Sequence, residues 1–272
     1  MTLPIDLVLV RHGQSEGNLA KRRSEAGDHS AYTRAFIDRH SASFRLTPKG
    51  CEQAERAGAF ILEEFYSKDG FGFDRYITSD YARAIETAGL LGLPNAEWFT
   101  DPYLTERDWG DLDASPQDER EARFGDALRR RQVEPFFWRP PGGERFADLC
   151  LRVDRVLLTL HNECDDMRVI IICHGEVLRA FQCRLERMPQ ARFKELTFSE
   201  IYEERIHNCQ IIHYTRRDPQ NKRKLGDYMG WTRWIRPTDT PVTTSGWTTI
   251  RRPRYSNEQL LEIARRNPAM VT

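Results

Sequence analysis

Two histidines occupy matching positions in the sequence, each at the end of a short apolar segment and each followed by glycine. His12 follows the apolar residues 7–10, and His174 follows the apolar residues 169–173. An imidazole at the end of a strand can act as a nucleophile, a base or a cationic donor. Ligands of open α/β sheets bind beyond the carboxyl ends of the strands. If the two strands are neighbours, we therefore expect both imidazole rings to face one crevice.

Two arginines are placed to add positive charge to the same crevice. Arg11 precedes His12, and Arg83 lies near the start of the helix predicted after a strand at residues 76–78. A guanidinium group can bind two phosphoryl oxygens at once, and a helix start adds backbone N–H donors. The whole chain carries 41 basic and 41 acidic residues, so this is a local positive site in a neutral protein. The combination suits a phosphoryl group.

Six segments of the chain resemble, in the same order, the motifs of the histidine phosphatase superfamily in its phosphoglycerate mutase-like branch. The resemblance covers about residues 7–214. The segments are 11–18 (RHGQSEGN), 46–54 (LTPKGCEQA), 78–88 (TSDYARAIETA), 104–110 (LTERDWG), 141–144 (PGGE) and 172–177 (ICHGEV). A single RHG tripeptide would be a weak signal, whereas six segments in the family order make the resemblance specific.

The resemblance implies a role for each matched residue. His12 would attack phosphorus and become phosphohistidine, while Arg11, Arg83 and His174 would bind the phosphoryl oxygens. Glu106 would protonate the leaving oxygen and then deprotonate the attacking water, because one carboxyl group can serve both steps. The resemblance also implies that neither a metal ion nor a cofactor is needed, since the arginines and His174 supply the positive charge.

Four further residues within these motifs have functions that the sequence leaves undecided. Asn18, Gln14 and Gly175 are candidates for binding the phosphate, although packing explains Gln14 equally well. Asp108 is the alternative to Glu106 as proton donor, because several carboxylates lie in the same loop. A solvated acidic loop is the structural alternative for both of them.

We predict a phosphomonoester hydrolase that acts through phosphohistidine on a small phosphorylated metabolite. The first alternative is a cofactor-dependent phosphoglycerate mutase. Those enzymes usually have Arg-His-Gly-Glu and Glu-Arg-His-Tyr-Gly, where this chain has Gln14 and the pair Asp108-Trp109. The second alternative is a phospho-ligand binding module without turnover, although every catalytic position is filled.

Composition limits the partners and the location of the protein. The neutral net charge argues against a nucleic-acid binder, and residues 1–10 suit neither a signal peptide nor a membrane span. No pair of the six cysteines has CxxC spacing, so we expect buried thiols in a reducing, cytoplasmic compartment. The basic residues 21–23 hint at a polyanionic ligand, with a solvated face as the alternative. The oligomeric state stays open.

Strands that alternate with helices must position these residues, and they predict an α/β fold. We expect a three-layer sandwich with a mostly parallel central sheet flanked by helices. Thr47 and Pro48 mark a helix start, and Ser79 or Asp80 is expected to cap another helix. The predicted strands are 7–10, 76–78, 168–173 and 206–214. One predicted helix begins at residue 48, and the others span 82–91, 117–131, 146–160 and 177–185.

The composition also divides the chain into two parts. Residues 1–215 are predicted to form the catalytic domain, with an insertion or lid at about 21–45. Residues 216–272 are rich in Gly, Pro, Trp and Arg, and are predicted to form an extension packed on that domain. We expect this extension to end in a helix at 257–266.

Overall fold

A mixed β-sheet forms the centre of the computed structural model, which describes residues 2–68, 70 and 72–266. Its parallel part contains β1 (Asp6–Arg11), β2 (Arg75–Thr78), β3 (Trp98–Thr100) and β4 (Arg168–Cys173). Its antiparallel part contains β5 (Ile211–Thr215), β8 (Trp231–Arg236), β9 (Thr243–Thr244) and β10 (Thr248–Thr249). The strand order is β10-β8-β5-β1-β4-β2-β3, and β9 pairs with β8. A separate hairpin contains β6 (Arg217–Asp218) and β7 (Asn221–Leu225).

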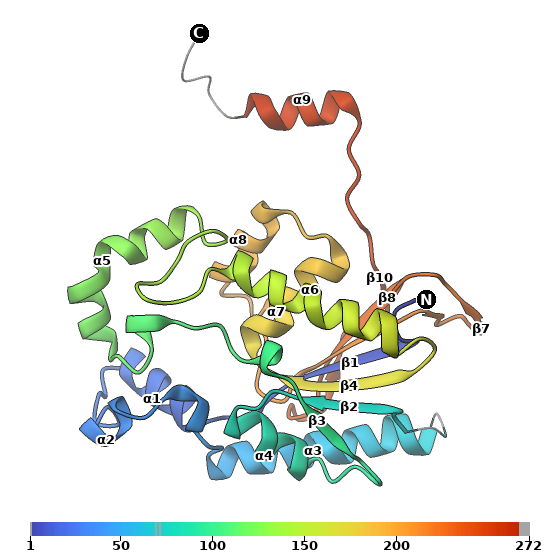
Figure 1. The fold of residues 1–272 in the computed structure, drawn as a ribbon, viewed down its shortest axis with the longest axis horizontal. Helices are drawn as coiled ribbons and strands as arrows, with labels where there is room; N and C mark the ends of the chain where they lie inside the picture. Colours follow the sequence, from blue (N-terminus) through green and yellow to red (C-terminus); the bar gives the residue numbers. More distant parts are fainter. Residues whose placement is uncertain (1, 69, 71, 267–272) are drawn as a thin grey trace.

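Helices cover both faces of this sheet, which confirms the predicted three-layer sandwich (Figure 1). One face carries α3 (Pro48–Ile61) and α4 (Ala82–Leu90). The other face carries α6 (Phe146–Glu163), α7 (Gly175–Glu186) and α8 (Gln190–Phe198). The remaining α-helices of the described residues are α1 (Glu16–Glu25), α2 (Arg34–Ile37), α5 (Gln117–Val133) and α9 (Asn257–Arg265). No described helix is long and apolar enough to span a membrane.

The central strands β1 and β4 are apolar at almost every position because both of their faces are buried. Leu7 and Leu9 point into the cluster beneath α6 and α7, while Val8 and Val10 point into the cluster above α3 and α4. All four side chains are completely inaccessible to solvent. A parallel strand covered by helices on both faces has this continuous apolar pattern.

Local signals in the sequence are right at one helix start and wrong at another. Thr47 caps α3 as predicted, since its hydroxyl accepts a hydrogen bond from the Gly50 N–H at 3.1 Å. The prediction that Ser79 or Asp80 caps α4 is wrong, because the residue at that position is Tyr81, which makes no side-chain cap. The last predicted strand begins at Ile211 rather than 206, because Cys209 has a left-handed backbone (φ 55°) that turns the chain first.

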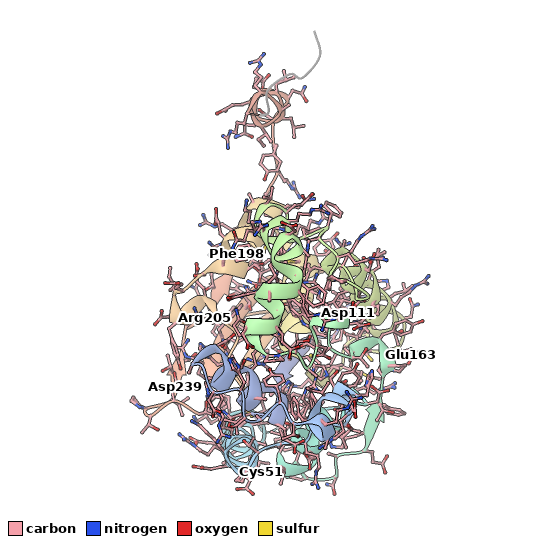
Figure 2. All side chains as sticks on the ribbon, turned by 90° about the vertical axis from the view of Figure 1, so that its left-hand side faces the viewer. Cys51, Asp111, Glu163, Phe198, Arg205 and Asp239 are labelled. Atoms are coloured by element: carbon pink, nitrogen blue, oxygen red, sulfur yellow. The ribbon has the colours of Figure 1, made fainter. Side chains whose placement is uncertain are left out.

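The C-terminal extension contributes strands to the main sheet. β8 hydrogen-bonds to β5, so the boundary predicted at residues 215/216 falls inside the sheet. This arrangement covers the backbone groups that β5 would otherwise expose at an edge. By contrast α9, at the end of the described chain, stands away from the body, and every one of its residues is exposed (Figures 1 and 2). The extension therefore packs on the domain through its strands and not through α9, and residues 267–272 lie outside the described part.

We predict that two truncations of the extension differ sharply in thermal stability. Removing residues 256–272 should change the midpoint of thermal unfolding by less than about 2 °C, because α9 buries no residue against the sheet. Removing everything after Gly230 deletes β8 and should lower the midpoint by about 10 °C or more. Circular dichroism melting curves measure both effects. Equal melting temperatures for the two truncations would contradict a structural role for β8.

Candidate active site

Pairing between β1 and β4 brings the two predicted catalytic histidines together. Arg11 is in register with Cys173, and the His12 N–H donates to the Cys173 carbonyl at 3.0 Å. The residues that follow the two strands therefore lie side by side, with the ring centroids of His12 and His174 5.1 Å apart. Both rings are buried, at the carboxyl edge of the parallel strands where the sequence placed them.

The hydrogen bonds of His12 determine which of its ring nitrogens is the nucleophile. Nδ1 lies 2.6 Å from the Gly13 carbonyl oxygen, which can only accept, so Nδ1 carries the proton. Nε2 then holds a free lone pair, and the Arg83 Nε donates to it at 3.2 Å. Burial, Arg83 and Arg11 hold the pKa of His12 well below its usual value, which keeps the ring neutral. An incoming phosphoryl group must replace the Arg83 hydrogen bond, because both use the same lone pair.

Two buried nitrogens beside His12 have no hydrogen-bond partner within the described residues, namely His174 Nδ1 and Arg11 Nε. The other ring nitrogen of His174, Nε2, shares a hydrogen bond with the Ser79 hydroxyl at 2.9 Å. A buried donor without an acceptor, such as Arg11 Nε, costs about 1–3 kcal/mol. A phosphoryl group bound here would supply an acceptor to Arg11 Nε, and also to His174 Nδ1 in the tautomer that carries the proton there.

Both arginines are held in place by backbone carbonyls. Arg83 Nη1 donates to the Ser41 carbonyl at 2.7 Å, and Arg11 Nη1 donates to the Ile206 carbonyl at 2.6 Å. These bonds fix the two guanidinium groups and leave other N–H groups free for an anion. Ser41 lies in the predicted insertion, so this segment touches the site directly. Gly175, the first residue of α7, lies against Arg11, and a Cβ at this position would be 3.4 Å from Arg11 Nε.

Gln14 links the histidine segment to neighbouring helices. With its amide oxygen turned toward α1, it accepts two hydrogen bonds from Arg22, at 2.8 and 3.2 Å. Its amide nitrogen then donates to the Thr47 hydroxyl at 3.0 Å. The structure therefore uses this side chain for positioning, and direct contact between Gln14 and phosphate stays a prediction.

Asn18 also has a positioning role in this structure. Its side-chain oxygen accepts from the Ser15 N–H at 3.3 Å and from Asn208 Nδ2 at 3.0 Å. Asn208 Nδ2 also donates to the His12 carbonyl at 3.1 Å. Sequence reasoning missed Asn208 because it lies alone in the loop before β5, far from every motif. Because the side-chain oxygen of Asn18 is already used, its amide nitrogen is the atom available to donate to phosphate. This phosphate contact stays a prediction.

Glu106 is the carboxyl group that suits proton transfer. It is partly exposed, and one carboxylate oxygen accepts the Arg107 N–H at 3.0 Å. Burial and the nearby Glu176 raise the pKa of Glu106 to about 7, against the lowering effect of Arg83 and Arg11. A group with this pKa can both donate and accept a proton near neutral pH. Asp108, the alternative donor, is exposed and accepts from the Gly110 N–H of its own loop at 2.8 Å.

Two arginines that sequence reasoning missed hold the loop of Glu106. Arg107 is buried and donates to the carbonyls of Glu144 at 2.9 Å and Trp138 at 3.1 Å. Arg152, on α6, binds the Glu144 carboxylate at 2.7 and 2.8 Å and the Thr105 carbonyl at 3.1 Å. Arg107 lies in a recognisable motif, whereas nothing in the sequence around Arg152 distinguishes it from other helix residues. Glu144 thus acts as the anchor of the Glu106 loop.

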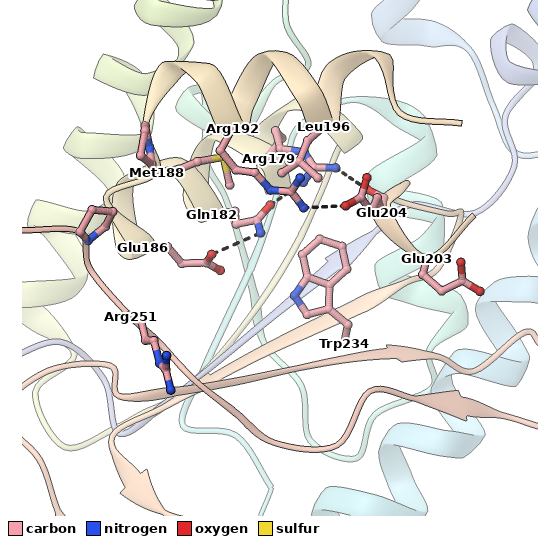
Figure 3. Close-up of a pocket in the computed structure, with 12 residues that line it drawn as sticks. Arg179, Gln182, Glu186, Met188, Arg192, Leu196, Glu203, Glu204, Trp234 and Arg251 are labelled. Carbon is pink, nitrogen blue, oxygen red and sulfur yellow. Dashed lines mark hydrogen bonds and ion pairs between the residues drawn. The ribbon is translucent and has the colours of Figure 1, made fainter. Parts of the chain in front are cut away.

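A separate pocket lies away from these residues, between α7, α8, β8 and the segment after β10 (Figure 3). None of the predicted site residues lines it, and two of its arginines bind neighbouring protein groups. Arg179 donates to Gln182 at 2.6 Å and to the Glu204 carbonyl at 2.6 Å, and Arg192 pairs with the Glu204 carboxylate at 2.6 Å. In the described ranges, no group of three or more His, Cys, Asp or Glu side chains is arranged to hold a metal ion.

We predict that Arg83→Gln weakens binding of inorganic phosphate or vanadate by about 10- to 100-fold, because a charge-assisted hydrogen bond contributes about 1.5–3 kcal/mol. Isothermal titration calorimetry measures the affinity. Arg123→Gln is the matched control, since Arg123 lies on α5 with 62% of its side chain exposed. Unchanged anion affinity in Arg83→Gln would show that the anion site lies elsewhere.

Comparisons with known proteins show which family the chain belongs to. A phosphoglycerate mutase named as 2,3-bisphosphoglycerate-dependent, from Methylobacterium radiotolerans, is 34% identical over 70% of this chain and 83% of its own length. The enzyme of the same name from Azorhizobium caulinodans is 34% identical over 67% and 82%. A putative α-ribazole-5′-phosphate phosphatase structure from Escherichia coli K-12 shares the fold, with a TM-score of 0.58, 20% identity and coverage of 83% and 96%. The histidine phosphatase superfamily (branch 1) model matches residues 7–223, and the chain belongs to this family.

Proposed function

We propose that the protein hydrolyses phosphomonoesters through a phosphohistidine intermediate on His12, without a metal ion. The observation that carries this proposal is the neutral His12, with its Nε2 lone pair beside two buried nitrogens, Arg11 Nε and His174 Nδ1, that lack hydrogen-bond partners. Nε2 attacks phosphorus, and the bond from phosphorus to the ester oxygen breaks. Arg11, Arg83 and His174 bind the phosphoryl oxygens and stabilise the charge that shifts onto them.

Glu106 transfers the proton in both halves of this reaction. In the first half its protonated carboxyl group gives a proton to the leaving ester oxygen. In the second half the carboxylate takes a proton from water, the water oxygen attacks phosphorus, and the bond from phosphorus to Nε2 breaks. The pKa of Glu106, raised to about 7, suits both directions.

Phosphoglycerate mutase activity is the second candidate, and the names of the sequence relatives favour it. In that reaction the phosphohistidine returns its phosphoryl group to a hydroxyl of a bound acid instead of to water. The first half-reaction is the same for both candidates. Against mutase activity, the loop after Glu106 has Asp108-Trp109 in place of the usual His-Tyr pair.

We predict that the wild type releases phosphate from 4-nitrophenyl phosphate in the presence of EDTA, and that His12→Ala reduces this rate at least about 10³-fold, because the nucleophile is lost. A parallel 3-phosphoglycerate mutase assay decides between water and hydroxyl as acceptor. Mutase turnover with little hydrolysis would establish the second candidate. Equal phosphate release by the wild type and His12→Ala would exclude His12 as nucleophile in either reaction.

We predict a pH dependence that belongs to Glu106. The protonated carboxyl group is required for a poor leaving group, so kcat/KM for an alkyl phosphate should fall as pH rises through about 7. Glu106→Gln should lower kcat/KM for the alkyl ester about 10²- to 10⁴-fold, and for 4-nitrophenyl phosphate much less. Equal losses on the activated and unactivated esters would refute the proton-donor role.

A further inference from the structure

The tautomer of His12 depends on the backbone of the residue that follows it. The His12 Nδ1–H donates to the Gly13 carbonyl at 2.6 Å, and this bond leaves the lone pair on Nε2. In the other tautomer Nε2 would carry the proton and could not attack phosphorus. The Arg83 bond to Nε2, at 3.2 Å, favours the reactive tautomer only until a phosphoryl group displaces it. During the attack, the Gly13 carbonyl is therefore the group that keeps the proton on Nδ1.

A glycine at position 13 makes this carbonyl easy to turn. A Cβ here would be 2.4 Å from the Gly50 carbonyl oxygen, so the close approach requires glycine, which has wide freedom of φ and ψ. The peptide between Gly13 and Gln14 is planar and trans, so its carbonyl and its N–H point in opposite directions. Turning the carbonyl away from His12 would turn the Gln14 N–H toward the ring, where a donor favours the unreactive tautomer. Groups outside the loop must therefore hold this peptide.

Helix α3 holds the peptide between Gly13 and Gln14. The start of α3 packs so closely that a Cβ on Gly50 would be 2.1 Å from the Gln14 carbonyl oxygen. The Thr47 N–H donates to the same oxygen at 2.9 Å. Gln53 follows about one turn later on α3, and its side-chain oxygen accepts the Gln14 N–H at 2.9 Å. Because this N–H and the Gly13 carbonyl belong to one planar peptide, the bond to Gln53 directs the carbonyl toward the imidazole ring.

Helix α4 holds the preceding peptide, between His12 and Gly13. Thr87 Oγ1 accepts the Gly13 N–H at 3.1 Å and donates to the Arg83 carbonyl at 2.7 Å. The Thr87 side chain is inaccessible to solvent, so water does not compete for these bonds. At the other end of the same peptide, Asn208 Nδ2 donates to the His12 carbonyl at 3.1 Å. Figure 1 shows α3 and α4 side by side on one face of the sheet, from which they hold the two successive peptides.

The Gly13 carbonyl also meets the charge that develops during the reaction. When Nε2 of His12 bonds to phosphorus, the ring becomes positive while Nδ1 keeps its proton. The hydrogen bond from Nδ1 then becomes charge-assisted, which makes it about twice as strong as a neutral one. The carbonyl thus does for His12 what the aspartate of a Ser-His-Asp triad does for its histidine, since it selects the tautomer and stabilises the cation. A change that turns this carbonyl away loses both effects.

We propose that Gln53 and Thr87 are positioning residues for the nucleophile: they hold the two peptides on either side of Gly13, so that its carbonyl keeps the proton on His12 Nδ1. The proposal rests on the function proposed above, in which Nε2 of His12 attacks phosphorus. Both residues act through the backbone and take no part in bond breaking. Their loss should slow the attack while the arginines that bind the phosphoryl oxygens stay in place.

The test measures the tautomer directly, by ¹⁵N NMR of the histidine rings at neutral pH, with the His12 signals assigned by their loss in His12→Ala. The wild type should show His12 with its proton on Nδ1. Gln53→Met and Thr87→Val keep the shape but remove the accepting oxygen, and each should raise the ratio of the Nε2-protonated form about 2- to 10-fold. Thr87→Ser keeps the hydroxyl and should keep the wild-type ratio. Because Gln53 is only partly buried, Gln53→Met tests the proposal even if Thr87→Val loses stability.

Kinetics and binding separate positioning from a general structural role. In Gln53→Met and Thr87→Val, kcat/KM for 4-nitrophenyl phosphate, which reports the attack by His12, should fall about 10-fold. The affinity for inorganic phosphate, measured by calorimetry, should stay close to that of the wild type. The matched controls are Gln132→Met on α5 and Thr159→Val on α6, two exposed helix residues that should match the wild type in every measurement.

Wild-type tautomer ratios in both Gln53→Met and Thr87→Val would overturn the proposal, as would a wild type whose His12 carries its proton on Nε2. Equal losses of phosphate affinity and kcat/KM with an unchanged tautomer would also overturn it, because that pattern indicates general distortion of the site. A chain that hydrolyses no ester would contradict the proposed function. The NMR measurement needs no turnover, so it would still support or overturn the positioning role.

Discussion

The parallel pairing of β1 with β4 is the constraint on which the rest of the site depends. The register that sets Arg11 opposite Cys173 also sets the two histidines side by side, because each follows its strand directly. Both faces of these strands are buried under helices. A shift of one residue would exchange the side chains of the two faces and turn His12 away from His174. The apolar packing of the core therefore fixes the geometry of the reaction centre.

The pKa values of His12 and Glu106 are shifted in opposite directions, and both shifts favour phosphoryl transfer. Burial and the neighbouring arginines lower the pKa of His12, so the nucleophile keeps its lone pair. The same arginines act to lower the pKa of Glu106, but burial and Glu176 outweigh them and raise it to about 7. A neutral nucleophile and a protonated acid therefore exist together near neutral pH. Without Glu176 the acid would lose part of this shift.

Motif spacing was enough to predict β1, β4, the Thr47 cap and the residues gathered around His12, because these depend on local patterns. It offered Ser79 or Asp80 as a helix cap, whereas the Ser79 hydroxyl shares a hydrogen bond with His174, which follows a strand distant in sequence. The addition of β8 to β5 was missed for the same reason, since strand pairing at long range leaves no local signal. Arg152, which anchors the Glu106 loop from α6, shows how a positioning residue can look like any exposed helix arginine in the sequence.

The residues of the reaction centre do not by themselves decide between hydrolysis and transfer to a second hydroxyl, because His12 and Glu106 would serve both reactions. The outcome depends on which acceptor reaches phosphohistidine, and so on how firmly the first product is held. A firmly bound product stays long enough to accept the phosphoryl group again, while a weakly bound product gives way to water. Helices α1 and α5 lie outside the strands that place His12 and His174. Differences in these segments can therefore change the reaction while the histidines, arginines and β1–β4 register stay the same.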